Sequence, residues 1–191
     1  MSATKFNPRN AVVIAIIIVI AAIRVLNNFS TEMTVLANYS PLAAMTLFGS
    51  AYFKGKIKPL LFPLMAIFIS DVVLFSTVYK NYGNGFLYNE WYWVYAAFLL
   101  MGISGKLIIK KITIANIAIA ILAAVFIHWI VTDLGVWIGS KTYPQTWSGF
   151  MLCLDAAIPF ELRLLLATVL YGAIMFGVFE LMQRKYVALN P

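Results

Sequence analysis

Residues 11–26 read AVVIAIIIVIAAIRVL, and Arg24 is the only charged residue among them. Lys5 and Arg9 precede this run, so it has the basic head and apolar centre of a signal peptide. However, no small-residue cleavage site follows, because Arg24 closes the run and Asn27 and Asn28 come next. Five further apolar segments follow along the chain. We therefore expect the run to be retained as the first of several membrane helices.

The composition of the whole chain also indicates an integral membrane protein. Of the 191 residues, 63% are apolar and 11% are charged, and the mean hydropathy is +0.90. A soluble domain is about 45–50% apolar and about 25% charged, so a soluble enzyme, a disordered chain and a fibrous repeat are excluded. The net charge of +7 is spread between apolar runs, so we expect no nucleic-acid partner. The single cysteine, Cys153, excludes an intramolecular disulfide and a cysteine-based zinc cluster.

We expect residues 1–191 to form one all-α integral membrane domain with six transmembrane helices. The expected spans are 11–26, 33–53, 59–79, 91–109, 112–137 and 162–182. The second span is interrupted, because Ser40 is a good N-cap and Pro41 suits the first helical position. A helix over 41–53 is about 20 Å long, which is short for a hydrocarbon core of ~30 Å. We therefore expect a short second helix with a bent or re-entrant entry.

The longest connection, 138–161, separates the fifth and sixth spans. Its apolar stretch 151–160 is too short to cross a membrane and contains Asp155 and Pro159. We interpret this stretch as a re-entrant or surface-lying cap.

Basic residues set the orientation of the spans. Of the 14 Lys and Arg residues, ten flank alternate helix ends: Lys5, Arg9, Lys54, Lys56, Lys58, Lys106, Lys110, Lys111, Arg184 and Lys185. The positive-inside rule then places both termini in the cytoplasm.

Two polar residues stand inside apolar spans. Asp71 lies near the middle of 59–79, where an ionised carboxylate costs several kcal/mol unless it is paired, hydrated or protonated. It is either a ligand contact in a water-accessible cavity or a tie to Ser, Asn or His on another helix. His128, the only histidine, is open to the same two interpretations.

No stretch indicates catalysis. The chain has no His-Glu-x-x-His helix, no phosphate-binding glycine loop and no Gly-x-Ser-x-Gly elbow. We therefore expect no enzyme, no metal site and no cofactor, and any uphill transport must draw energy from an ion gradient or a partner.

Several motifs together resemble a known family. They are SPLAAMTLFGSAYF at 40–53, Ser70-Asp71, TDLGVW at 132–137, YPQTWSGF at 143–150 and AAIPF at 156–160. With these motifs the chain resembles a family of bacterial (Bacteroidetes-type) transport proteins, which looks like the substrate-binding S components of energy-coupling factor (ECF) transporters. That family resemblance implies a six-helix protein that takes up a vitamin or cofactor precursor from outside.

The resemblance also implies where the solute binds. S components hold it between the outer helix ends, under regions that correspond here to 27–39 and 132–160. We expect an outward cavity with Asp71 and the 38–41 turn as its floor and 143–155 as its lid. Its expected residues are Asn38, Tyr39, Ser40, Asp71, His128, Asp133, Trp137, Tyr143, Trp147 and Asp155.

Partners follow from the same resemblance. Small residues on the first span of S components contact a transmembrane coupling subunit, which acts with ATPases in trans. Ala11 and Ala15 match that spacing. Two other functions remain open: a scaffolding subunit of a membrane complex without a solute site, and, less favoured, a small intramembrane enzyme.

The orientation is directly testable. An alkaline phosphatase domain fused after Lys56 should be inactive, and one fused after Thr142 should be active, because the enzyme requires the oxidising outer side. Phosphatase assays on intact cells check both fusions. The reverse pair of activities would overturn the orientation.

Overall fold

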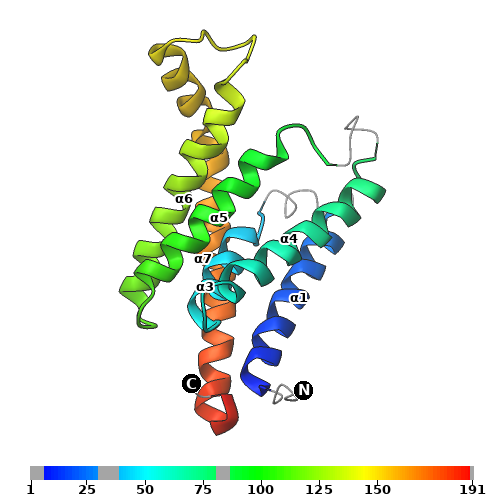
Figure 1. Cartoon of the computed structure of the whole chain (residues 1–191), viewed down its shortest axis with the longest axis vertical. Helices are drawn as coiled ribbons and strands as arrows, with labels where there is room; N and C mark the ends of the chain where they lie inside the picture. The colour runs from blue at the N-terminus through cyan, green and yellow to red at the C-terminus, as the bar shows by residue number, and fades with distance from the viewer. Residues whose placement is uncertain (1–6, 30–38, 81–86, 190–191) are drawn as a thin grey trace.

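The computed structural model describes residues 7–29, 39–80 and 87–189, and within these ranges it contains helices and connections but no strand (Figure 1). Six α-helices are present in the described ranges, followed by the short 3-10 helix η2 (Val187–Leu189). They are α1 (Pro8–Phe29), α3 (Leu42–Tyr52), α4 (Lys58–Thr77), α5 (Trp91–Ile108), α6 (Ile114–Trp137) and α7 (Trp147–Lys185). All except α3 are long and apolar enough to cross a membrane. The all-helical membrane class is therefore confirmed, and the described residues contain five candidate spans where six were expected.

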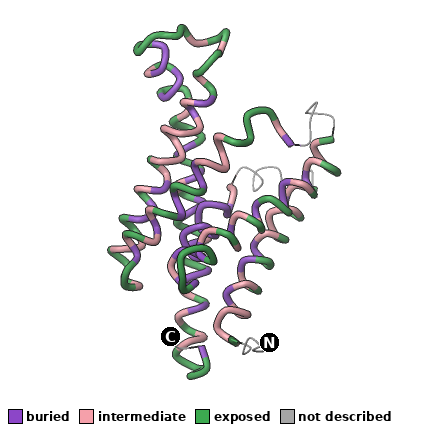
Figure 2. The backbone as a smooth tube through the Cα atoms, in the orientation of Figure 1, coloured by how far each residue is buried: buried purple, intermediate pink, exposed green. Residues whose placement is uncertain are grey.

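The short helix α3 forms the centre of the bundle. It contacts all five longer helices, and ten of its 11 residues are buried (Figure 2). The reason is its sequence, LAAMTLFGSAY, which has no charged residue and no polar face. The hydroxyls of Thr46 and Ser50 donate to carbonyls of the same helix, at 2.9 and 2.7 Å. A helix that needs no water on any side can be enclosed completely.

The start of α3 differs in one detail from the expectation. Pro41 is the N-cap residue, and it has no side-chain capping bond. Ser40 is one position further out, where its Oγ accepts a long hydrogen bond of 3.5 Å from the Leu42 amide. Residues 33–38, the expected re-entrant entry, lie outside the described residues.

Aromatic rings connect α3 to α7. Phe48 packs edge-on against Phe176 with 5.4 Å between ring centroids, and Tyr52 packs against Phe179 at 4.5 Å. The Tyr52 hydroxyl also donates a 2.5 Å hydrogen bond to Glu180. These contacts hold the C-terminal end of α3 against the second half of α7.

The predicted cap at 151–160 is wrong in the structure. These residues belong to α7, which is continuous over 39 residues and contains Pro159. Thr146 starts this helix by accepting a 3.2 Å bond from the Gly149 amide. Pro159 lacks an N–H, so it removes only the helical bond to the Asp155 carbonyl, and both residues are exposed.

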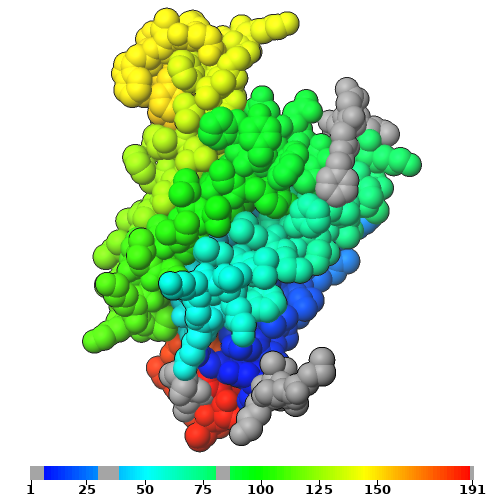
Figure 3. All heavy atoms as spheres, viewed as in Figure 1, coloured from blue at the N-terminus to red at the C-terminus, as the bar shows by residue number. Residues whose placement is uncertain are grey.

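The length of α7 explains where the expected lid residues lie. At 1.5 Å per residue α7 is ~58 Å long, about twice a hydrocarbon core of ~30 Å. Its first turns pair with the end of α6 in a hairpin whose tip stands clear of the other helices (Figures 1 and 3). Residues 143–155 therefore do not close over the bundle.

The basic residues gather at one end of the molecule. The two termini lie at the same end (Figure 1), where α1 and α4 begin and α5 and α7 finish. The described members of the basic set flank these helix ends, and the Lys106 ammonium donates to the carbonyl of Gly55. The charge asymmetry in the sequence is thus an asymmetry between the two ends of the bundle.

Close packing of α3 on α4 gives a stability test. A Cβ on Gly49 would collide with the Pro63 ring, which is rigid. Gly49→Ala should therefore lower the free energy of unfolding by about 1–3 kcal/mol, measured as a lower melting temperature in detergent. Gly177→Ala is the matched control, because nothing lies within 4 Å of its Cβ position, and it should be neutral or slightly stabilising. Equal melting of wild type and Gly49→Ala would contradict this packing.

Candidate functional site

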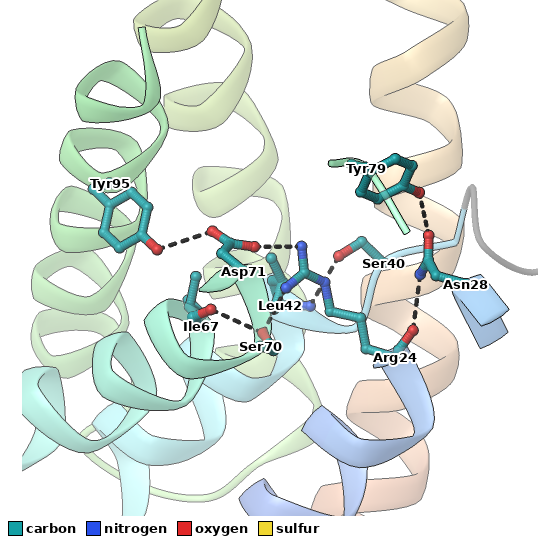
Figure 4. A network of polar contacts seen from close by, with 9 residues as sticks. All are labelled: Arg24, Asn28, Ser40, Leu42, Ile67, Ser70, Asp71, Tyr79 and Tyr95. Carbon is teal, nitrogen blue, oxygen red and sulfur yellow. Dashed lines mark hydrogen bonds and ion pairs between the residues drawn. The ribbon is translucent and has the colours of Figure 1, made fainter. Parts of the chain in front are cut away.

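A buried ion pair joins α1 to α4 (Figure 4). Arg24 Nη2 lies 2.6 Å from Asp71 Oδ1, and Arg24 Nη1 donates to Ser70 Oγ at 2.5 Å. From α5, the Tyr95 hydroxyl donates to the other Asp71 oxygen at 2.9 Å. The Asp71 side chain is only 3% exposed, whereas that of Arg24 is 16% exposed. Both carboxylate oxygens of Asp71 thus have partners, and Arg24 is the more accessible partner.

The network extends toward the end of the bundle opposite the termini. Asn28 Nδ2 donates to the Arg24 carbonyl at 2.8 Å, and the Tyr79 hydroxyl donates to Asn28 Oδ1. Tyr88, just before α5, lies close enough for the Asp71 carboxylate to act on it. Burial first, and then this carboxylate, raise the pKa of Tyr88, so its phenol stays protonated and keeps its hydrogen-bond donor.

The beginning of α3 lies beside this ion pair. Figure 4 shows Ser40 and Leu42 next to the Arg24 side chain. The first amides of a helix have no partner within the helix, and they carry its positive dipole end. Of the 38–41 turn that was expected to floor a cavity with Asp71, Ser40 lies near the Arg24 side chain in Figure 4, and Tyr39 precedes it, half-buried. Asn38 lies outside the described residues.

A second polar network joins α6 to α7. His128 Nδ1 lies 2.8 Å from Glu161 Oε1, which makes this pair a tie between the two helices. The Cys153 thiol is 3.7 Å from both the carbonyl and the Oδ1 atom of Asp133. Asp133 and Glu161 are each only 8% exposed.

The remaining expected residues lie at the tip of the α6–α7 hairpin. The Trp137 indole donates to the Pro144 carbonyl at 2.8 Å and packs against Phe150. Trp147 is 74% exposed, Tyr143 is half-buried, and Asp155 is exposed. These residues hold the turn between two helices together.

The structure thus divides the expected cavity into two networks. Asp71 and Ser40 belong to the network around α1, α4 and α5, whereas His128 and Asp133 lie between α6 and α7. The helix α5 contacts both networks, through Tyr95 in the first and through the Phe98 ring, 5.8 Å from His128, in the second. The tip residues join neither, because the continuous α7 carries them away from the bundle.

Sequence reasoning missed several members of these networks, and the charged or directly paired ones are Arg24, Tyr95 and Glu161. Arg24 lies within the expected span 11–26 but was interpreted only as the charge that closes the apolar run, although it continues the buried face of α1 formed by Val13, Ile17 and Ile20. Helical spacing along that face was a usable signal. Glu161 likewise falls on the buried stripe of α7.

Within the described ranges, no three His, Cys, Asp or Glu side chains are arranged to hold a metal ion. The polar groups of both networks are suited to accepting or donating hydrogen bonds and to compensating charge.

The Arg24–Asp71 pair predicts a large stability effect. Asp71→Ala should lower the free energy of unfolding by about 3–5 kcal/mol, because it leaves the Arg24 charge without a partner. Adding Arg24→Met should recover part of that loss. Unfolding in detergent measures both, and the exposed Asp155→Ala, as a control, should stay within about 0.5 kcal/mol of wild type. Strictly additive losses would show that the two charges do not stabilise each other.

Comparison with known proteins places this architecture in a family. A family model described as a family of unknown function (DUF6580) matches residues 4–189. No curated protein and no solved structure matches the chain. Because the family model spans nearly the whole chain, the protein belongs to the DUF6580 family.

Proposed function

We propose that this protein is the substrate-binding component of a bacterial inner-membrane uptake system, similar to ECF S components, and that it binds a small solute such as a vitamin or cofactor precursor. One observation carries the proposal. The central helix α3 begins inside the bundle, and its N-terminal end lies beside the buried Arg24–Asp71 pair (Figure 4). In transporters, broken helices point such N-termini at anionic groups of the substrate.

The chemistry around Arg24 favours an anionic group on the solute. A guanidinium has five N–H donors, and the pairs with Asp71 and Ser70 use one donor on each of the two terminal nitrogens of Arg24. The N-terminal end of α3 adds a partial positive charge nearby. A carboxylate of the solute would complete both sets of donors, with Asp71 holding Arg24 in position.

The orientation and the partners form part of the same proposal. With the basic end in the cytoplasm, the Arg24 network lies toward the outer side. Ala15 is exposed and Ala11 half-buried, away from the buried residues Val13 and Ile17. This face of α1 is available to a coupling subunit, and ATPases in trans would supply the energy. The chain itself acts as a binding protein and not as an enzyme.

A melting assay against a panel of vitamins and their precursors tests the proposal. A solute present at 100 times its dissociation constant should stabilise the purified protein by about 2.7 kcal/mol. Arg24→Gln should weaken that binding at least tenfold, which corresponds to about 1.4 kcal/mol. Arg163→Gln is the matched control, because Arg163 is exposed and lies over the Phe160 ring on α7, and its affinity should equal that of wild type.

A scaffolding role is the second candidate, and a groove between α6 and α7 favours it. The groove measures about 610 Å³ and is lined mainly by apolar side chains, among them Ile117, Leu122, Val169 and Phe176. An apolar helix of a partner subunit would fill such a groove. If no solute in the panel changes the melting temperature, and copurification yields a stable membrane partner, the scaffolding role is favoured and the proposed uptake function is wrong.

A further inference from the structure

One of the two carboxylate oxygens of Glu161, in the α6–α7 hairpin, lacks a hydrogen-bond partner in the described part of the chain. Its Oε1 atom pairs with His128. Its Oε2 atom is fully buried and has no hydrogen-bond partner in the described part of the chain, and the residue is more than nine-tenths buried. A buried carboxylate oxygen that accepts no hydrogen bond destabilises the folded protein. This atom therefore indicates a ligand that supplies a proton or a hydrogen-bond donor.

The surroundings of this oxygen contain more negative than positive charge. On α6 the titratable groups are His128 and Asp133, and on α7 they are Glu161 and the Cys153 thiol. His128 pairs with Glu161 at 2.8 Å, and Asp133, five positions after His128 on α6, is contacted by Cys153 of α7 at 3.7 Å, so the three groups lie along the same α6–α7 interface.

The neighbouring helices bring no compensating cation in the described ranges. From α5, the Phe98 ring packs on His128, and α3 has no charged residue at all. The other charged residues on this part of α7, Asp155 and Arg163, are exposed on its outer side.

Charge balance then determines how many protons the cluster holds. Two carboxylates and one imidazole are neutral together only when two protons are distributed over the three groups. One of them neutralises the His128–Glu161 pair, whichever of its two groups carries the proton. The other must reside on a carboxyl group, because an uncompensated charge in the membrane interior costs several kcal/mol.

We propose that His128, Glu161 and Asp133 form an intramembrane proton-binding site, in which the carboxyl groups of Glu161 and Asp133 hold one exchangeable proton beside the His128–Glu161 pair. The ligand is the proton itself, which needs no cavity of its own. This site does not depend on the solute site around Arg24, and it would give the protein a direct connection to a proton gradient.

The two carboxylates lie at different depths. Asp133 is four residues from the end of α6 at Trp137, a distance of ~6 Å along the helix, whereas His128 is ~14 Å from that end. A proton arriving from the hairpin tip would reach Asp133 first and Glu161 next. The Cys153 thiol beside Asp133 is a weak donor and competes little for that carboxylate.

Infrared spectroscopy of the purified protein in lipid tests the proposal. The chain has only seven acidic residues, so the C=O stretching band of a protonated carboxyl group can be assigned by substitution. At neutral pH the wild type should show a band for one protonated carboxyl group that shifts in D2O. Asp133→Asn or Glu161→Gln should remove it, and the exposed control Asp155→Asn should leave it unchanged.

Modification of the wild-type protein gives a second measurement that needs no variant. An apolar carbodiimide adds the O–H of a protonated carboxylic acid across its C=N bond, so it should label the peptide that contains Asp133 or Glu161. Labelling there, detected by mass spectrometry, supports the site even if the variants fail to fold. A wild type without a protonated-carboxyl band and without this label carries a permanently ionised cluster, and that result overturns the proposal.

Discussion

The complete burial of α3 is the constraint on which the rest of the structure depends. An apolar helix of 11 residues is too short to cross a membrane, so both of its ends lie where water is scarce. The surrounding helices must therefore supply the polar groups near those ends. Arg24 and Asp71 do so beside its N-terminal end, and Glu180 does so at Tyr52 near its C-terminal end. The positions of the polar networks thus follow from enclosing a helix that does not span.

The charges inside the bundle are arranged in two different ways. Around Arg24, opposite charges balance and both carboxylate oxygens of Asp71 are bonded, so Asp71 holds the Arg24 guanidinium in position. Between α6 and α7 the balance is incomplete, since the described part of this interface holds two carboxylates, Asp133 and Glu161, and one histidine, and Glu161 Oε2 has no partner. A satisfied network favours stability and can still offer a partly exposed donor such as Arg24 to a solute, whereas the unsatisfied Glu161 oxygen is a place where a proton can bind.

Much of the architecture was predictable because membrane helices follow simple local rules. The length and apolarity of the segments predicted the bounds of α1, α4, α5 and α6 to within a few residues. The pair Ser40-Pro41 predicted the start of the short helix α3 to within two residues. The prediction of a cap at 151–160 was wrong, because Pro159 and Asp155 were interpreted from the local sequence as residues that end a helix. One missing N–H on an exposed face does not end a helix whose opposite face is packed against α6. That packing is a tertiary contact and is not visible in the local pattern.

The sequence by itself determined the class of the protein, an all-helical membrane protein with basic residues at one end, because apolar length and charge distribution are properties of single segments. Its intramembrane residues Asp71 and His128 were also identified from the sequence as costly and therefore paired or functional. Their partners were decided only by the tertiary structure. Arg24 lies 47 positions from Asp71, and Glu161 lies 33 from His128, so nothing local links them. Which buried charges meet depends on how the helices pack around α3, and this packing is a property of the folded bundle.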